Sequence, residues 1–160
     1  MLRTGPIGVA VLVVLAAICV GGCGSGEDDI PDPKETVVAL FGAMDRDDQA
    51  AIPYVLDLEE MMKNIQTDYA LSLDSARVFH SPEEIIADLT FEGRTKKRWF
   101  SFQRIVNKAN VIDANTATVD VTFVDKEASK AYISRFGLHM VNGKWKIYSF
   151  NTIQQRPETN

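Results

Sequence analysis

The hydrophobic period of the sequence changes near Trp99, and this change constrains the fold more than any other feature. Before it, apolar residues recur with the spacing of a helix, at Val37, Leu40, Phe41 and Met44 and again at Leu58, Met61, Met62, Ile65 and Tyr69. After it, apolar and polar residues alternate from 116 to 124, as in a half-buried strand. Helices followed by antiparallel strands predict an α+β fold with the helices packed on one face of the sheet.

Cap residues mark where the helices begin. Asp32 and Ser81 are favourable N-caps, each followed by a proline and, three positions later, by a glutamate. We therefore expect helices that start near residues 33 and 82. Pro53 interrupts a second helical stretch between them.

Strands and a hairpin are predicted in the second half of the chain. Residues 102–112 are typical of a strand with a bulge, and Asn142-Gly143 predicts a two-residue type I′ turn. Pairing across this turn forms an apolar face from three pairs: Met140 with Trp145, Leu138 with Ile147, and Phe136 with Ser149. His139 falls on the polar face opposite Lys146, where we expect it to be exposed to solvent.

Composition excludes several classes of protein. The chain has 160 residues, 46% of them hydrophobic, and a net charge of −5. These values fit one globular domain and argue against nucleic acid as the main partner, because phosphate binding needs a basic surface. With two cysteines and two histidines, His80 and His139, we expect neither a disulfide framework nor a metal site. No glycine-rich phosphate loop or nucleophile elbow is present, so we expect no cofactor.

The first 23 residues carry a targeting signal. Residues 7–20 form an apolar run of 14 residues, short for a membrane span and typical of a signal peptide. The following residues Val20, Gly21, Gly22 and Cys23 resemble the lipobox of bacterial lipoproteins, in which an aliphatic and two small residues precede an acylated cysteine. The resemblance implies that residues 1–22 are removed and that Cys23 is acylated, so that the membrane is a partner. The alternative is an uncleaved anchor helix, or a signal peptide cleaved at another position, with no role for Cys23.

The expected domain organisation follows from this signal. Residues 23–32 form an acidic, flexible tether, residues 33–153 form the domain, and residues 154–160 form a C-terminal tail. The domain is expected outside the cytoplasm in the cell envelope, held at the outer membrane of a Gram-negative cell or at the outer leaflet of the cytoplasmic membrane of a Gram-positive one.

The domain resembles a known group of proteins. A helix over 33–43 leads into a charged turn, and the chain closes on a strand from Asn142 to Ile147. This arrangement resembles the NTF2-like, or cystatin-like, α+β cone, and in particular small bacterial lipoproteins of the DUF4878 type. The resemblance implies a curved sheet around a long helix with a pocket between them, and no shared catalytic residues.

Two groups of residues are candidate functional sites. Six side chains are possible pocket lining: Phe41, Met44, Tyr54, Met61, Met62 and Tyr69. If the pocket is catalytic, Asp57 would act with Tyr54 and Tyr69, although core packing is the favoured interpretation. The segment 94–100, RTKKRWF, is either a membrane-facing patch or a solvated junction whose aromatic residues enter the core, and we favour the junction.

These observations lead to one main hypothesis and two alternatives. The main hypothesis is a membrane-anchored lipoprotein that binds a small apolar ligand or an envelope protein and is not an enzyme. The first alternative is an isomerase or dehydratase that uses a pocket Asp and Tyr. The second alternative is a purely structural envelope factor.

Overall fold

The computed structural model describes residues 31–71, 79–150 and 154–155. Its helices are α1 (Pro33–Asp45), α2 (Ile52–Val55), α3 (Leu58–Leu71), α4 (Pro82–Leu89) and α5 (Arg94–Phe100). Its strands are β1 (Gln103–Asp113), β2 (Thr116–Asp125), β3 (Lys130–Val141), β4 (Lys144–Phe150) and β5 (Gln154–Gln155). Helices therefore precede strands, and the predicted α+β class is confirmed.

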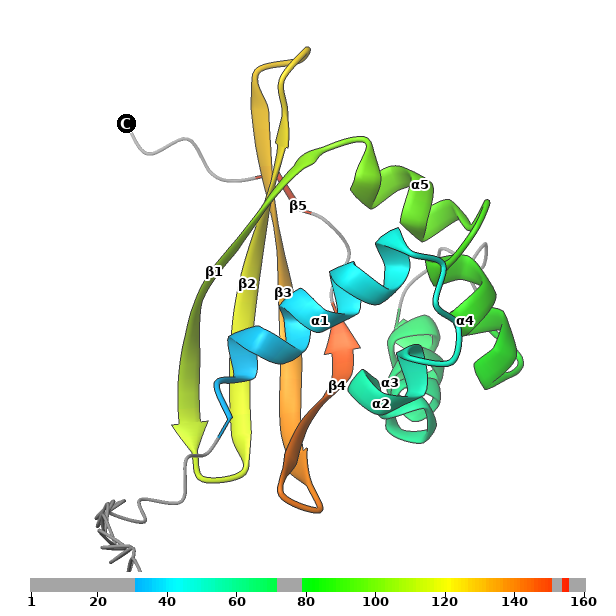
Figure 1. Cartoon of the computed structure of the whole chain (residues 1–160), viewed down its shortest axis with the longest axis vertical. Coiled ribbons are helices and arrows are strands. Elements are labelled where there is room, and N and C mark those ends of the chain that lie inside the picture. Colours follow the sequence, from blue (N-terminus) through cyan, green and yellow to red (C-terminus); the bar gives the residue numbers. More distant parts are fainter. Residues whose placement is uncertain (1–30, 72–78, 151–153, 156–160) are drawn as a thin grey trace, which may run out of the picture.

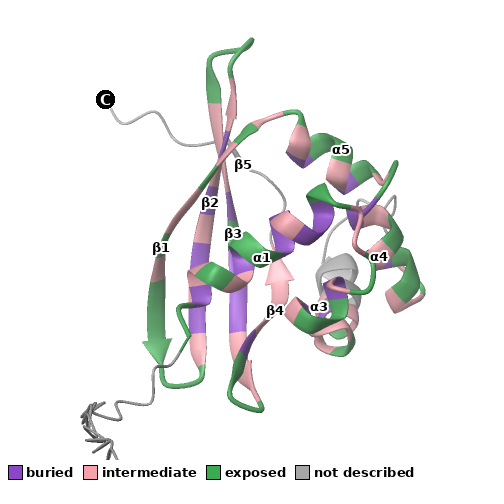
Figure 2. Cartoon of the chain, viewed as in Figure 1, coloured by how far each residue is buried: buried purple, intermediate pink, exposed green. Residues whose placement is uncertain are grey.

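The sheet is antiparallel, with strand order β1-β2-β3-β4, and the short β5 pairs with β3. Figure 1 shows α1 lying across the sheet, while α2, α3, α4 and α5 gather to one side of it. The buried parts of α1, β2 and β3 face each other where α1 crosses the strands (Figure 2). This layer of helix on sheet buries the apolar stripe of α1 against the apolar face of the strands.

The predicted N-caps are present at α1 and α4. The Asp32 carboxylate accepts a hydrogen bond of 2.9 Å from the Lys34 N–H, and Pro33 begins α1. At α4, the Ser81 hydroxyl accepts from the Glu84 N–H at 3.4 Å. The Glu84 carboxylate accepts from the His80 N–H at 2.8 Å, one residue earlier than a capping box requires. These caps satisfy backbone donors that the first helical turns leave unpaired.

The segment 94–100 forms α5 and divides into two faces. Trp99 is only 4% exposed and Thr95 is also buried, whereas Arg94, Lys97 and Arg98 are exposed. The junction interpretation is therefore confirmed for Trp99, which enters the core. Phe100 is half-buried, and the Arg104 guanidinium lies 3.7 Å from the centre of its ring.

The alternation along β2 is as predicted. Ala117, Val119, Val121 and Phe123 are fully buried, and the residues between them are half-buried. The bulge expected in the preceding strand is also present, because the β1–β2 register shifts between Val106 and Ala109 and again between Val111 and Asp113. A shift of this kind bends the strand and increases its twist.

The β3–β4 hairpin has the predicted turn, with positive φ at Asn142 and Gly143 (51° and 74°). Met140 pairs with Trp145 and Leu138 pairs with Ile147, as expected. The third expected pair is wrong: Phe136 pairs with Phe150, and Ser149 pairs with Gly137. A register shift between Gly137 and Leu138 inserts one extra residue in β4, which places Phe150 rather than Ser149 on the apolar face.

Candidate functional site

The side chains expected to line a pocket are placed in different environments. Met44 and Met61 are fully buried, Phe41 is 8% exposed, and all three belong to the hydrophobic core. Met62 is half-buried and packs against that core, whereas Tyr54 is 77% exposed on α2. The side chain of Tyr69 lies outside the described residues. The structure therefore does not bring Tyr54 together with the buried methionines.

Aromatic rings occupy the space between α1, α5 and the sheet. The Phe41 ring lies 5.7 Å from Trp99 and 6.1 Å from Phe136, measured between ring centres. Trp99 also lies 5.1 Å from Phe150 at a steep angle. Edge-to-face contacts at these distances stabilise aromatic clusters beyond the area that they bury. The region in which the family resemblance implies a pocket is thus packed with core side chains.

The strongest polar contact of chemical interest joins Asp57 and His139. The Asp57 Oδ2 lies 3.0 Å from the His139 Nε2, and their side chains are 23% and 30% exposed. The other carboxylate oxygen of Asp57 accepts from the Glu60 N–H at 3.1 Å in the first turn of α3. The expectation that His139 is solvent-exposed is therefore wrong. The sequence did not indicate this contact, because the two residues are 82 positions apart.

The beginning of α3 reaches His139 because the chain before α3 lies along β4. Leu56 forms a parallel bridge with Ile147, and the Asp57 N–H donates to the Ile147 carbonyl at 2.9 Å. Lys146, on the His139 side of the sheet, donates to the Pro53 carbonyl at 3.0 Å. Residues 53–57 thus cover the outer edge of β4 and bring the Asp57 carboxylate over the polar face of the sheet.

Tyr148 completes this polar group. Its ring centre lies 5.0 Å from that of His139, and Gly137 provides the space for it. A Cβ at Gly137 would stand 2.9 Å from Tyr148 Cζ and 2.5 Å from Ser149 Oγ. The glycine is therefore required by close packing on this face. The alternation beside Asn142-Gly143 already puts Tyr148 on the polar face with His139, but it gives no sign of the bulge in β4 or of the contact between the two rings.

The electrostatics of Asp57 limit what this group can do chemically. Burial raises the pKa of Asp57, but the Glu60 N–H, His139 and Lys146 lower it by more, so that it lies below its ordinary value of 3.8. Asp57 is therefore ionised at neutral pH and cannot serve as a general acid there. Both of its oxygens already hold a partner. The contacts of the Asp57 carboxylate with the Glu60 N–H and His139 therefore connect the start of α3 to the sheet and stabilise the fold.

The opposite edge of the sheet is open. β1 is the outermost strand of the sheet, and in the described part of the chain no strand pairs with its other side. Three large apolar side chains of β1 are exposed: Ile105 by 46%, Val111 by 57% and Ile112 by 59%. Unpaired backbone groups beside exposed apolar side chains are the features that an added strand of another chain recognises. We call Ile105, Val111 and Ile112 the apolar edge.

Within the described ranges, no three histidine, cysteine, aspartate or glutamate side chains lie together in a way that could hold a metal ion. In the same part of the chain, no helix has both the length and the apolar character needed to cross a membrane.

Comparison with known proteins gave no relative: no family model matches the chain, and no curated protein matches it.

Proposed function

We propose that the chain is an extracytoplasmic lipoprotein, anchored through Cys23, whose domain binds an envelope protein and carries no catalysis. The anchor is supported by the apolar run 7–20 that leads into Val20-Gly21-Gly22-Cys23. Two acyl chains on such a cysteine are enough for stable membrane attachment. The finer fold assignment, an NTF2-like cone, is supported by one long helix crossing an antiparallel sheet (Figure 1).

The apolar edge is the observation that carries the proposed binding function. The two edges of the sheet differ: residues 53–57 cover β4, whereas β1 exposes Ile105, Val111 and Ile112. An extended segment of a partner can add to β1 through backbone hydrogen bonds, with its apolar side chains against the apolar edge. Four of the six side chains expected to bind a small ligand belong to the core or pack against it, which favours a protein partner over a small apolar molecule: Phe41, Met44, Met61 and Met62.

Site-specific photo-crosslinking tests this proposal. A photoreactive phenylalanine analogue replaces Ile112 in the acylated chain, in intact cells, and the matched control places it at Ala128 in the exposed β2–β3 turn. We expect a discrete protein adduct from position 112 and none from 128. Equal adducts at the two positions, or none at either, would contradict binding at the apolar edge and favour the purely structural factor. Binding of a fluorescent apolar probe that Met62→Asp abolishes would instead favour a small ligand.

The Asp57–His139 contact is the one observation that favours the alternative of an isomerase or dehydratase. A histidine oriented by a carboxylate is a common arrangement for a general base. The lowered pKa of Asp57 and its role at the start of α3 favour the structural interpretation. Turnover of a panel of small enones that is lost in Asp57→Asn, with the fold intact, would establish the enzyme and overturn our proposal.

A further inference from the structure

The turn between α4 and α5 presents an exposed aromatic residue. Phe91 is 58% exposed and has a φ of +48°, in the left-handed region that bulky residues rarely adopt. Such a conformation persists only where the surrounding structure enforces it. Because the Phe91 side chain is mostly exposed, its burial contributes little to stability, while the Phe91 backbone adopts an unfavourable conformation. This combination points to a contact made outside the domain.

Several hydrogen bonds fix this turn. The Asp47 carboxylate accepts from both the Phe91 N–H and the Lys96 ammonium. The Asp88 carboxylate accepts from the Arg94 N–H at 3.0 Å and from the Thr95 N–H at 3.2 Å. Hydrogen bonds to Asp47 and Asp88 thus fix the backbone on both sides of the turn that carries Phe91.

Basic side chains follow Phe91 in the sequence and lie on one face of α5. Arg94, Lys97 and Arg98 are all exposed, and their spacing places them on the same side of the helix, opposite buried Trp99. Lys97 contacts Glu92, and both of these side chains are more than half exposed, so the pair is weak. No carboxylate pairs with Arg94 or Arg98 among the side chains that the structure describes.

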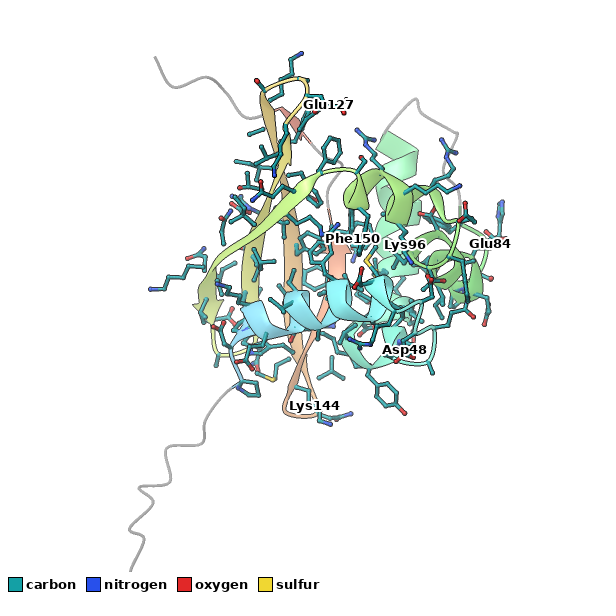
Figure 3. All side chains as sticks on the ribbon, turned by 45° about the horizontal axis from the view of Figure 1, so that its top comes forward. Asp48, Glu84, Lys96, Glu127, Lys144 and Phe150 are labelled. Atoms are coloured by element: carbon teal, nitrogen blue, oxygen red, sulfur yellow. The ribbon has the colours of Figure 1, made fainter. Side chains whose placement is uncertain are left out.

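The two glutamates of α4 lie away from this face, whereas its Asp88 accepts from the Arg94 and Thr95 N–H groups at the start of α5. Glu83 and Glu84 are in the first turn of α4, about 8 Å along the helix from its last residue, Leu89, at 1.5 Å per residue. Figure 3 shows Glu84 at the outer side of α4, away from Lys96. The turn and the exposed face of α5 therefore combine one apolar side chain with a local excess of positive charge.

We propose that Phe91, Arg94, Lys97 and Arg98 form a docking surface for an anionic phospholipid membrane. Positive charge complements the headgroups, and an aromatic side chain enters the interface below them. Each basic side chain near an anionic surface strengthens partition about fivefold. This surface differs from the membrane-facing patch considered in the sequence, because its aromatic member is Phe91 and not the buried Trp99.

The proposal rests on the proposed anchor at Cys23, which keeps the surface close to a membrane. In Figure 1, α5 lies on the other side of the domain from the beginning of α1. Nine residues from 23 to 31 can span at most about 30 Å, so the domain can lie on its side with α5 at the lipid surface. A tether of this length gives an effective concentration in the millimolar range, so a weak docking surface is occupied.

Fluorescence quenching tests the docking surface. The acylated full chain carrying Phe91→Trp is purified from membranes and reconstituted in vesicles whose phospholipids carry brominated acyl chains, either anionic or neutral. Trp99 and Trp145 are each 4% exposed and provide the common background. The matched control is Tyr54→Trp, at an exposed position on α2. We expect bromine quenching of the new tryptophan at position 91, stronger in anionic vesicles, and no added quenching at position 54.

A second variant distinguishes attraction by the basic side chains from mere closeness of the domain to the membrane. Replacing Arg94, Lys97 and Arg98 with glutamine in the Phe91→Trp chain is expected to remove the extra quenching in anionic vesicles. Equal quenching at positions 91 and 54, or quenching that ignores lipid charge, would overturn the docking surface while the anchor stands. A chain that fails to float with vesicles would overturn the anchor, and the docking surface with it.

Discussion

Trp145 offers a quantitative test of the packing that we describe. It is 4% exposed, lies opposite Met140 in the β3–β4 hairpin, and belongs to the hydrophobic core. Removing a buried tryptophan leaves a cavity, and Trp145→Ala is expected to lower the free energy of unfolding by about 3–5 kcal/mol. Lys146→Ala, on the opposite face, removes the hydrogen bond to the Pro53 carbonyl and a positive charge near Asp57, and should cost at most about 1 kcal/mol.

The indole nitrogen of Trp145 sharpens this test. Its Nε1–H is buried and has no hydrogen-bond partner. A buried donor without a partner costs about 1–3 kcal/mol. Trp145→Phe removes this donor while losing part of the ring volume, which costs about 2 kcal/mol. The two effects oppose each other, so Trp145→Phe is expected to change the free energy of unfolding by no more than about 1 kcal/mol.

The assay is urea denaturation of the fragment 31–160, followed by circular dichroism, for wild type and the three variants. Equal losses for Trp145→Ala and Lys146→Ala would refute the assignment of the hairpin faces. A loss for Trp145→Phe as large as that for Trp145→Ala would refute the reasoning about the unpartnered donor.

Three further changes test other parts of the structure. Because the pKa of Asp57 lies below its ordinary value of 3.8, the stability that this residue contributes is present above pH 3.8 and is lost as the pH falls through the folded-state pKa. Asp57→Asn should therefore lower the free energy of unfolding by about 1 kcal/mol at pH 7 and make stability less dependent on acid pH. An acid-unfolding transition that the substitution leaves unchanged would contradict the Asp57–His139 contact. Gly137→Ala should lower the free energy of unfolding in urea by about 1–3 kcal/mol, because the new Cβ would stand 2.5 Å from the Ser149 Oγ. Adding Ser149→Ala should restore part of this free energy. If it restores none, the clash with Ser149 is not the cause of the destabilisation. Cys23→Ser should abolish acylation, because only a thiol can form the thioether, and mass spectrometry of the membrane fraction that finds wild type unmodified would contradict the anchor.

Local patterns predicted the elements better than their contacts. Asn142-Gly143 and the flanking alternation were enough to place Met140 opposite Trp145, because a two-residue turn and one apolar face together determine the register. The same reasoning failed at Phe136, since a bulge shifts the register and alternation does not reveal where an extra residue is accommodated.

The candidate sites were less predictable than the fold. Helical spacing placed Met44 and Met61 on the apolar faces of their helices, but spacing alone does not distinguish a residue that lines a pocket from one that packs in the core. The contact between Asp57 and His139 depends on residues 53–57 following the edge of β4, a long-range arrangement with no local signature. The exposure of Phe91 depends in the same way on Asp47, which is distant in the sequence.

The central claim is that the domain binds a protein partner at its apolar edge. Amide hydrogen exchange of β1 tests this claim most directly. The exchange of segment 103–113 is compared between the chain in its native membranes and the same chain purified in detergent, with segment 130–141 of the central β3 as the internal reference. An added strand would pair with the open side of β1 and protect its outward amides. We predict slower exchange of 103–113 in native membranes and no change in 130–141. Equal exchange of 103–113 in the two samples would contradict the proposed function.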